Sequence, residues 1–104
     1  MMSKTIKVSI YINEADQWQH RPLYVEILQM LLENGVAGGT VLRAIAGFTQ
    51  QTAIQTATLV DVGSKLPLVI QFIDTLERVE TVLPELRRMS GSRLIIHEDV
   101  QIFD

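Results

Sequence analysis

Twice along its 104 residues, the chain passes from a strand pattern to a helix pattern and back to a strand pattern. The first strand has apolar residues at every second position, the period that buries one face of a strand: Ile6, Val8, Ile10 and Ile12. A helix pattern follows between Pro22, which suits a first helical turn, and Gly35, which suits a helix end. This succession limits the possible folds more than any other feature of the sequence.

The strand that closes the first unit is followed by the strand that opens the second. Residues 40–48 are predicted as one strand and residues 66–73 as the next, where Pro67 is acceptable only at the beginning. Between these strands lies a polar segment, residues 49–65, which is too long for an ordinary hairpin loop. We therefore expect this polar segment to be functional.

The second helix begins with a local signal and contains one proline. Asp74 and Glu77 have the spacing of an N-terminal capping box, and the helix is expected to end at Gly91. Pro84 is expected to kink this helix or restart it near Leu83, because a proline inside a helix loses a hydrogen bond and clashes with the preceding turn.

The last predicted strand covers residues 94–96, and residues 100–103 are expected to extend the sheet. The order is therefore β-α-β-β-α-β. With right-handed crossovers it predicts an α+β, ferredoxin-like fold in which two helices cover one face of an antiparallel sheet. We expect a single domain, residues 1–104, whose other sheet face is covered by further copies of the chain, since large exposed apolar faces are rare on monomers.

Charge and composition argue against several classes of function. The formal net charge is −3 and the longest basic cluster is Arg87-Arg88, so nucleic-acid binding has little electrostatic support. Cysteine is absent, and the only histidines, His20 and His97, lie far apart in the sequence, so no metal site is expected. The apolar stretch 66–73 is too short to span a membrane. A cytoplasmic location without membrane insertion is the expectation, since the first residues lack a signal-peptide pattern.

Glycines are concentrated in residues 35–48, directly after the first helix pattern: Gly35, Gly38, Gly39 and Gly47. Two readings stand side by side. Glycines at both ends of a strand let a ligand or another chain approach the backbone closely. Alternatively, the first glycine merely ends the helix and the next two turn the chain.

Residues 45–49, Ile-Ala-Gly-Phe-Thr, resemble the string that closes the second strand of PII signalling proteins, with a threonine in place of the final glycine. Residues 66–74 and the helix after them are similar to the PII third strand and second helix. The closer likeness is to an uncharacterised branch of PII-like proteins, on these residues: Asp16, Trp18, Pro22, Leu23, Gly39, Thr40, Val41, Leu42, Arg43, Gly47, Phe48, Leu66 and Pro67.

This resemblance implies a homotrimer that binds adenine nucleotides or similar effectors in clefts between subunits, with the polar segment 49–65 reporting occupancy to a partner protein. The implied ligand-binding residues are Arg43, Gly47, Phe48, Thr49, Gly91 and Arg93. The turn at residues 89–93 is poorer in glycine than in PII proteins, and the arginine-bearing C-terminal segment of that family is missing. Among AMP, ADP, ATP and cyclic nucleotides, these departures favour a mono- or diphosphate or a cyclic nucleotide.

Other readings of the same residues remain open. A structural or adaptor trimer without a nucleotide is one, and a small ferredoxin-like enzyme with its site at a subunit interface is another. We expect no enzyme activity and no cofactor, because serine, threonine and aspartate show no catalytic constellation. Trp18 either stacks on a base or packs over the helix end, and Arg87 and Arg88 either face solvent or contact a phosphate.

Overall fold

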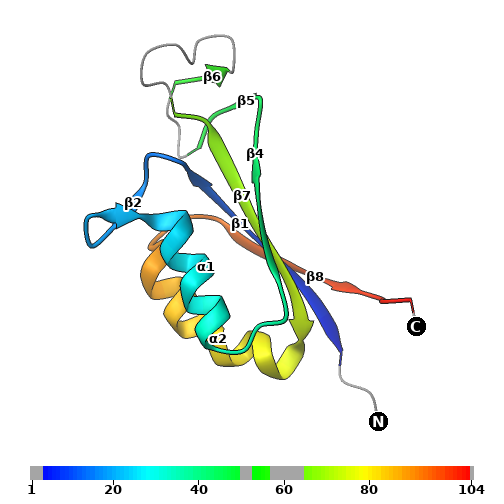
Figure 1. Cartoon of the computed structure of the whole chain (residues 1–104). Coiled ribbons are helices and arrows are strands. Elements are labelled where there is room, and N and C mark those ends of the chain that lie inside the picture. The colour runs from blue at the N-terminus through cyan, green and yellow to red at the C-terminus, as the bar shows by residue number, and fades with distance from the viewer. Residues whose placement is uncertain (1–3, 50–52, 57–64, 104) are drawn as a thin grey trace.

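The computed structural model describes residues 4–49, 53–56 and 65–103. Within this part of the chain, the main sheet has the order β4-β7-β1-β8, with every neighbouring pair antiparallel. Its strands are β1 (Thr5–Asn13), β4 (Gly39–Arg43), β7 (Pro67–Thr75) and β8 (Ile95–Val100). Helices α1 (Leu23–Glu33) and α2 (Leu76–Ser90) cover the same face of this sheet (Figure 1). The predicted ferredoxin-like α+β fold is confirmed.

The hydrophobic core lies between the helices and the sheet. The central strands supply it by alternation: Ile10 of β1 lies opposite Ile70 of β7 and Ile95 of β8. The largest fully buried side chains are Ile10, Ile12, Leu23, Ile27, Leu31, Ile70, Leu86, Val8 and Val82. The period-2 pattern of the first strand and the helical spacing after Pro22 therefore define the two sides of one core.

The start of α2 differs by one residue from the predicted capping box. Thr75 is the N-cap, and its Oγ1 accepts a hydrogen bond from the Arg78 N–H at 3.2 Å. The Asp74 carboxylate instead accepts from the Ala37 N–H at 2.9 Å and so ties the connection between α1 and β4 to the end of β7. Threonine and aspartate are both good N-cap residues. Here Asp74 bonds to Ala37, and Thr75 caps the helix.

The expected restart near Leu83 is wrong, because α2 runs from Leu76 to Ser90 as one helix with Pro84 inside it. Pro84 lies on the exposed side of the helix, where water can satisfy the carbonyl group that loses its partner. Val82 and Leu86 are buried on either side of the proline, and their packing holds the helix against the sheet through this position.

Several strand boundaries were also predicted incorrectly. The strand expected at residues 40–48 is divided into β4 and a short β5 (Ala46–Gly47), which pairs with β6 (Gln55–Thr56). Two short strands, β2 (Gln17–Trp18) and β3 (Arg21–Pro22), form a hairpin that the sequence analysis missed. The last strand continues through the acidic residues 98–99, and residues 101–103 are not part of it. Most of the polar segment 49–65 lies outside the described residues.

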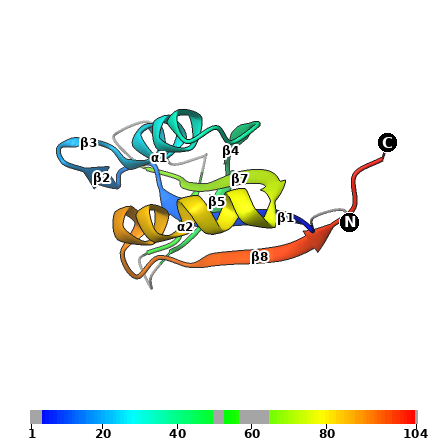
Figure 2. The same ribbon diagram turned by 90° about the horizontal axis from the view of Figure 1, so that it is seen from below.

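The sheet face opposite the helices, here called the open face, is partly apolar. The register places Tyr11, Leu42, Ile73 and Ile96 on it, with exposed fractions of 37%, 50%, 42% and 40%. Figure 2 shows α1 near β4 and α2 near β8, both on the other side of the sheet. The homotrimer thus remains a prediction, with this face as its candidate interface. In the described part of the chain, no helix is both long and apolar enough to cross a membrane.

Candidate functional site

A turn after β1, residues 13–16, is the polar centre at one end of the sheet. The Asn13 side-chain amide donates to Gln55 Oε1 at 2.7 Å and to the Lys65 carbonyl at 3.2 Å. Asp16 Oδ2 accepts the Asn13 N–H at 2.9 Å and closes the turn. The 13–16 turn therefore holds two described residues of the polar segment, Gln55 and Lys65.

Arg43, a predicted ligand residue at the end of β4, forms an ion pair with this turn. Its Nη2 donates to Glu14 Oε1 at 2.9 Å, and the same oxygen accepts the Leu66 N–H at 2.8 Å. The Arg43 hydrogen bond is the main cause of a lowered pKa of Glu14, the Leu66 N–H lowers the pKa further, and burial opposes both. Glu14 therefore joins the end of β4 to the start of β7 as a carboxylate.

Acid should weaken this contact in a predictable way. Because the pKa of Glu14 is lower in the folded protein than in the unfolded chain, its contribution to stability is present above the ordinary glutamate pKa of about 4.5. The contribution is lost as the pH falls through the lowered value. We expect Glu14→Gln to flatten the fall in the free energy of unfolding below pH ~4.5, measured by urea denaturation across pH.

A control variant should remove a carboxylate charge from an ion pair at another place in the structure. Asp99→Asn removes one charge from an exposed pair with Lys4, whose Nζ lies 3.6 Å from Asp99 Oδ2. Because exposed ion pairs contribute little to stability, this control is expected to change the free energy of unfolding at neutral pH by no more than about 0.5 kcal/mol. An equal slope in the Glu14 variant and the unsubstituted protein would contradict the assigned contact.

Arg93, the second predicted arginine, is also held by the 13–16 turn. Its Nε donates to Asp16 Oδ2 at 2.8 Å, and its Nη1 donates to the Ser90 carbonyl at 3.1 Å. The side chains of this pair are 24% and 23% exposed, respectively. A partly buried ion pair with a further hydrogen bond fixes the guanidinium more firmly than an exposed pair would.

Phe48 and Thr49 lie on the other side of this end of the sheet. They line a hollow of about 200 Å³ together with Tyr11 of β1 and Leu94, which immediately precedes β8. Tyr11 and Leu94 are joined by a backbone hydrogen bond of 3.0 Å. Residues at the start of the polar segment and the residue before β8 therefore line the same hollow at this end of the open face.

Two predicted site glycines occupy backbone conformations that favour glycine. Gly47 has φ +155°, and a Cβ there would lie 3.2 Å from Pro67 Cγ. Gly91 has φ +60° and ends α2, where its carbonyl accepts from Arg87 Nη1 at 2.6 Å. Arg87 Nη1 also donates to the Arg93 carbonyl at 3.0 Å, so Arg87 supports the turn at residues 91–93. The backbone conformation at both positions, and the close approach of Pro67 to Gly47, therefore explain why glycine is present without a bound ligand.

The structure therefore brings the predicted ligand residues to the same end of the sheet, although not into one cavity. Two carboxylates that hold the arginines could not be identified as their partners from the sequence: Asp16 was named only for the family resemblance, and Glu14 was not named. Their partners lie 29 and 77 residues away in the chain, so local spacing carries no signal for these pairs.

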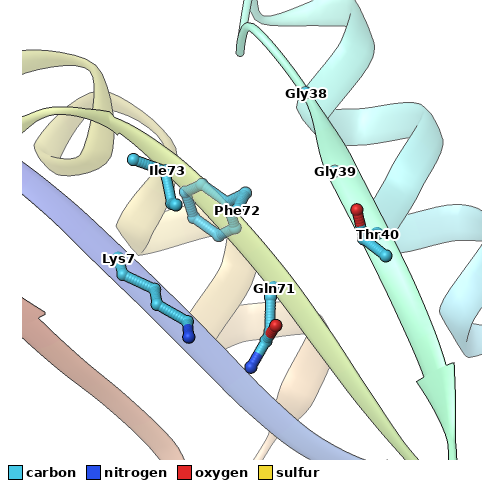
Figure 3. A pocket seen from close by; sticks show the side chains of 7 residues that line it. All are labelled: Lys7, Gly38, Gly39, Thr40, Gln71, Phe72 and Ile73. Atoms are coloured by element: carbon cyan, nitrogen blue, oxygen red, sulfur yellow. The ribbon is translucent and has the colours of Figure 1, made fainter. Parts of the chain in front are cut away.

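A second hollow, of about 410 Å³, lies at the opposite end of the sheet (Figure 3). Its lining residues are Lys7, Gly38, Gly39, Thr40, Gln71, Phe72 and Ile73. The two glycines and Thr40 belong to the glycine-rich segment singled out above. Lys7 and Gln71 come from β1 and β7 and face the same side of the sheet as Thr40, since they occupy alternate positions to the buried residues.

The remaining aromatic candidate has a partner within the chain. Arg88 lies over the Trp18 ring at 5.0 Å from its centroid, and Trp18 packs against the hydrophobic core. Arg88 also donates to both carboxylate oxygens of Glu85, at 2.8 and 2.6 Å. These contacts favour the packing interpretation of Trp18. In the described residues, no three histidine, cysteine, aspartate or glutamate side chains form a group that could hold a metal ion.

Solved structures with similar folds include PII-like and CutA1 proteins. CPII, a nitrogen regulatory PII-like protein from Thiomonas intermedia bound to ADP, AMP and bicarbonate, matches with a TM-score of 0.68 and 18% identity, over 94% of this chain and 87% of that chain. The divalent ion tolerance protein CutA1 from Ehrlichia chaffeensis also matches with a TM-score of 0.68, at 14% identity, over 100% of this chain and 88% of that one. At these identities the likeness establishes the fold.

Sequence comparison gives the family. Residues 5–102 match the family model described as "DUF190: Uncharacterized ACR". A UPF0166 protein of Aquifex aeolicus is 33% identical over 93 residues, covering 89% of this chain and 88% of the relative. A UPF0166 protein of Methanocaldococcus jannaschii is 27% identical over 103 residues, covering 98% and 94%. The chain therefore belongs to the DUF190 family, and its relatives include UPF0166 proteins.

Proposed function

We propose that this protein is a PII-like regulator that binds a phosphorylated adenine-type effector in clefts between the subunits of a homotrimer. The polar segment 49–65 then reports occupancy to a partner protein. The observation that carries the proposal is the position of the two hollows, which lie at opposite ends of one sheet. The likeness to CPII, a protein solved with ADP, AMP and bicarbonate, supports the class of effector.

The two ends of the sheet offer different chemistry. Gly38 and Gly39 present backbone without side chains, so a flat base can approach closely there. Arg43 and Arg93 supply cationic hydrogen-bond donors for a phosphate at the other end. Because the two ends belong to one rigid sheet, a single small ligand can meet both kinds of group only where two copies of the chain lie side by side.

The partly apolar open face supports such an assembly. Ile73 of the second hollow and Tyr11 of the first are both on this face, so copies that cover it bring the hollows to the subunit boundary. We propose the ligand contacts at Arg43, Gly47, Phe48, Thr49, Gly91 and Arg93 on one subunit, with the glycine-rich hollow contributed by its neighbour.

Thermal stabilisation by candidate effectors tests this function. The purified protein is heated with AMP, ADP, ATP, cyclic AMP or bicarbonate, and its melting temperature is compared with that of the unliganded protein. A ligand at 100 times its dissociation constant adds about 2.7 kcal/mol to the stability of the native state. A selective rise with adenine nucleotides is the expected result.

Two variants locate the binding. Gly38→Val places a side chain where no heavy atom lies within 4 Å of the added Cβ, so it should fold normally and fill the second hollow. Ala37→Val is the matched control beside that hollow, because Ala37 does not line it. We expect Gly38→Val alone to lose the ligand-induced rise. No rise with any nucleotide in the unsubstituted protein would overturn the proposal and leave the adaptor trimer.

A further inference from the structure

The two arginines proposed to contact phosphate are already neutralised within their own chain. Arg43 Nη2 lies 2.9 Å from Glu14 Oε1, and Arg93 Nε lies 2.8 Å from Asp16 Oδ2. Both carboxylates belong to the 13–16 turn. A phosphate that approaches either guanidinium therefore also approaches a carboxylate of the same turn.

These carboxylates are held in place by the backbone as well as by the arginines. Glu14 Oε1 accepts the Leu66 N–H at 2.8 Å, and Asp16 Oδ2 accepts the Asn13 N–H at 2.9 Å. Moving either carboxylate aside to admit a phosphate would leave these backbone donors without their partners, which is unfavourable. The two negative charges consequently remain in place when a ligand arrives.

In the pair formed by Arg43 and Glu14, the arginine is accessible and the carboxylate is mostly covered. The Arg43 side chain is 52% exposed, whereas the Glu14 side chain is 19% exposed. A ligand can therefore approach the Arg43 guanidinium from the solvent side while Glu14 keeps its bond to Nη2. Arginine suits this double use because its planar group carries five N–H donors.

Repulsion between the ligand and these fixed carboxylates grows with the negative charge of the ligand. Resting on the function proposed above, we propose that Glu14 and Asp16 are specificity-determining residues that favour adenine nucleotides of low phosphate charge over triphosphates. The arginines supply geometry and hydrogen bonds, and the paired carboxylates prevent them from forming a strongly cationic site. The effector class is thereby narrowed to adenine nucleotides that carry less charge than a triphosphate.

Removing the two charges without changing shape tests this selection. The double variant Glu14→Gln with Asp16→Asn keeps an oxygen that can accept from Leu66, Asn13 and the arginines. Isothermal titration calorimetry with AMP and with ATP gives the ratio of their dissociation constants. The unsubstituted protein is expected to bind AMP more tightly, and the double variant to shift the ratio toward ATP by roughly tenfold or more, the order expected for like charges near a protein surface.

The control is Glu80→Gln, which removes one negative charge from the exposed side of α2. It is expected to leave the ratio unchanged. Glu14→Gln and Asp16→Asn are also measured singly, and each should move the ratio in the same direction, so the test survives if the double variant fails to fold. A protein that binds nucleotides with the same ratio in all variants overturns this inference alone. Absence of any nucleotide binding to the unsubstituted protein overturns the proposed function and this inference together.

Discussion

Leu86→Ala should lower the free energy of unfolding by about 3 kcal/mol, within the range of roughly 2 to 5 kcal/mol for buried leucines. Leu86 is 0% exposed and lies in the part of α2 that packs against the sheet. The substitution removes apolar contacts and leaves a cavity that the surrounding side chains fill only in part. Urea denaturation measures the loss, at one fixed protein concentration because association would add to apparent stability.

Leu32→Ala is the matched control for this substitution. Leu32 lies in α1 and is 69% exposed, so the same chemical change removes little buried surface. Both variants replace leucine by alanine inside a helix, and the difference between them therefore isolates burial from helix propensity. The control should change stability by no more than about 0.5 kcal/mol. Equal losses in the two variants would contradict the placement of Leu86 in the core.

The fold was predictable because the core depends on periodicity. The alternation from Ile6 to Ile12 and the helical spacing between Pro22 and Gly35 identify the buried side of each element without knowledge of its neighbours. Element boundaries depend on individual contacts. Asp74 and Thr75 are both plausible caps in the sequence, and only the hydrogen bond from Ala37 to Asp74 shows why the threonine has that role.

The candidate site was less predictable because, like the element boundaries, it depends on individual contacts between distant parts of the chain. Gly47, Gly91, Arg43 and Arg93 were predicted as ligand residues from the resemblance to PII-like proteins, which depends on short strings of residues close together in the sequence. The acidic partners of the two arginines come from one turn that folding brings to them from distant parts of the chain. Long-range ion pairs of this kind have no spacing rule. Whether the predicted residues bind a ligand stays a prediction that the titrations above decide.

A charged substitution on the open face should have a large effect on assembly. This face is the proposed subunit interface, and the proposed site is completed only by a neighbouring copy of the chain. Ile96 lies on this face opposite Ser9, which is 3% exposed at the centre of the sheet. Ile96 itself is 40% exposed in the single chain, so an aspartate there can remain hydrated in a monomer. In an assembly that covers the face, the same carboxylate would be buried without a partner.

If the protein is the proposed trimer, Ile96→Asp is expected to convert it into monomers, with light scattering showing a mass near that of one 11.7 kDa chain instead of three. An unpaired charge buried at the interface costs about 3 to 5 kcal/mol, enough to weaken association by roughly two to four orders of magnitude. Leu32→Asp on the outer side of α1 introduces the same charge away from the open face and should leave the trimer intact. If Ile96→Asp keeps the mass of the unsubstituted trimer, or if the unsubstituted protein is itself monomeric, the open face is not the subunit interface. Loss of the trimer together with loss of nucleotide stabilisation would instead link assembly to binding, because each proposed site needs residues from two copies of the chain.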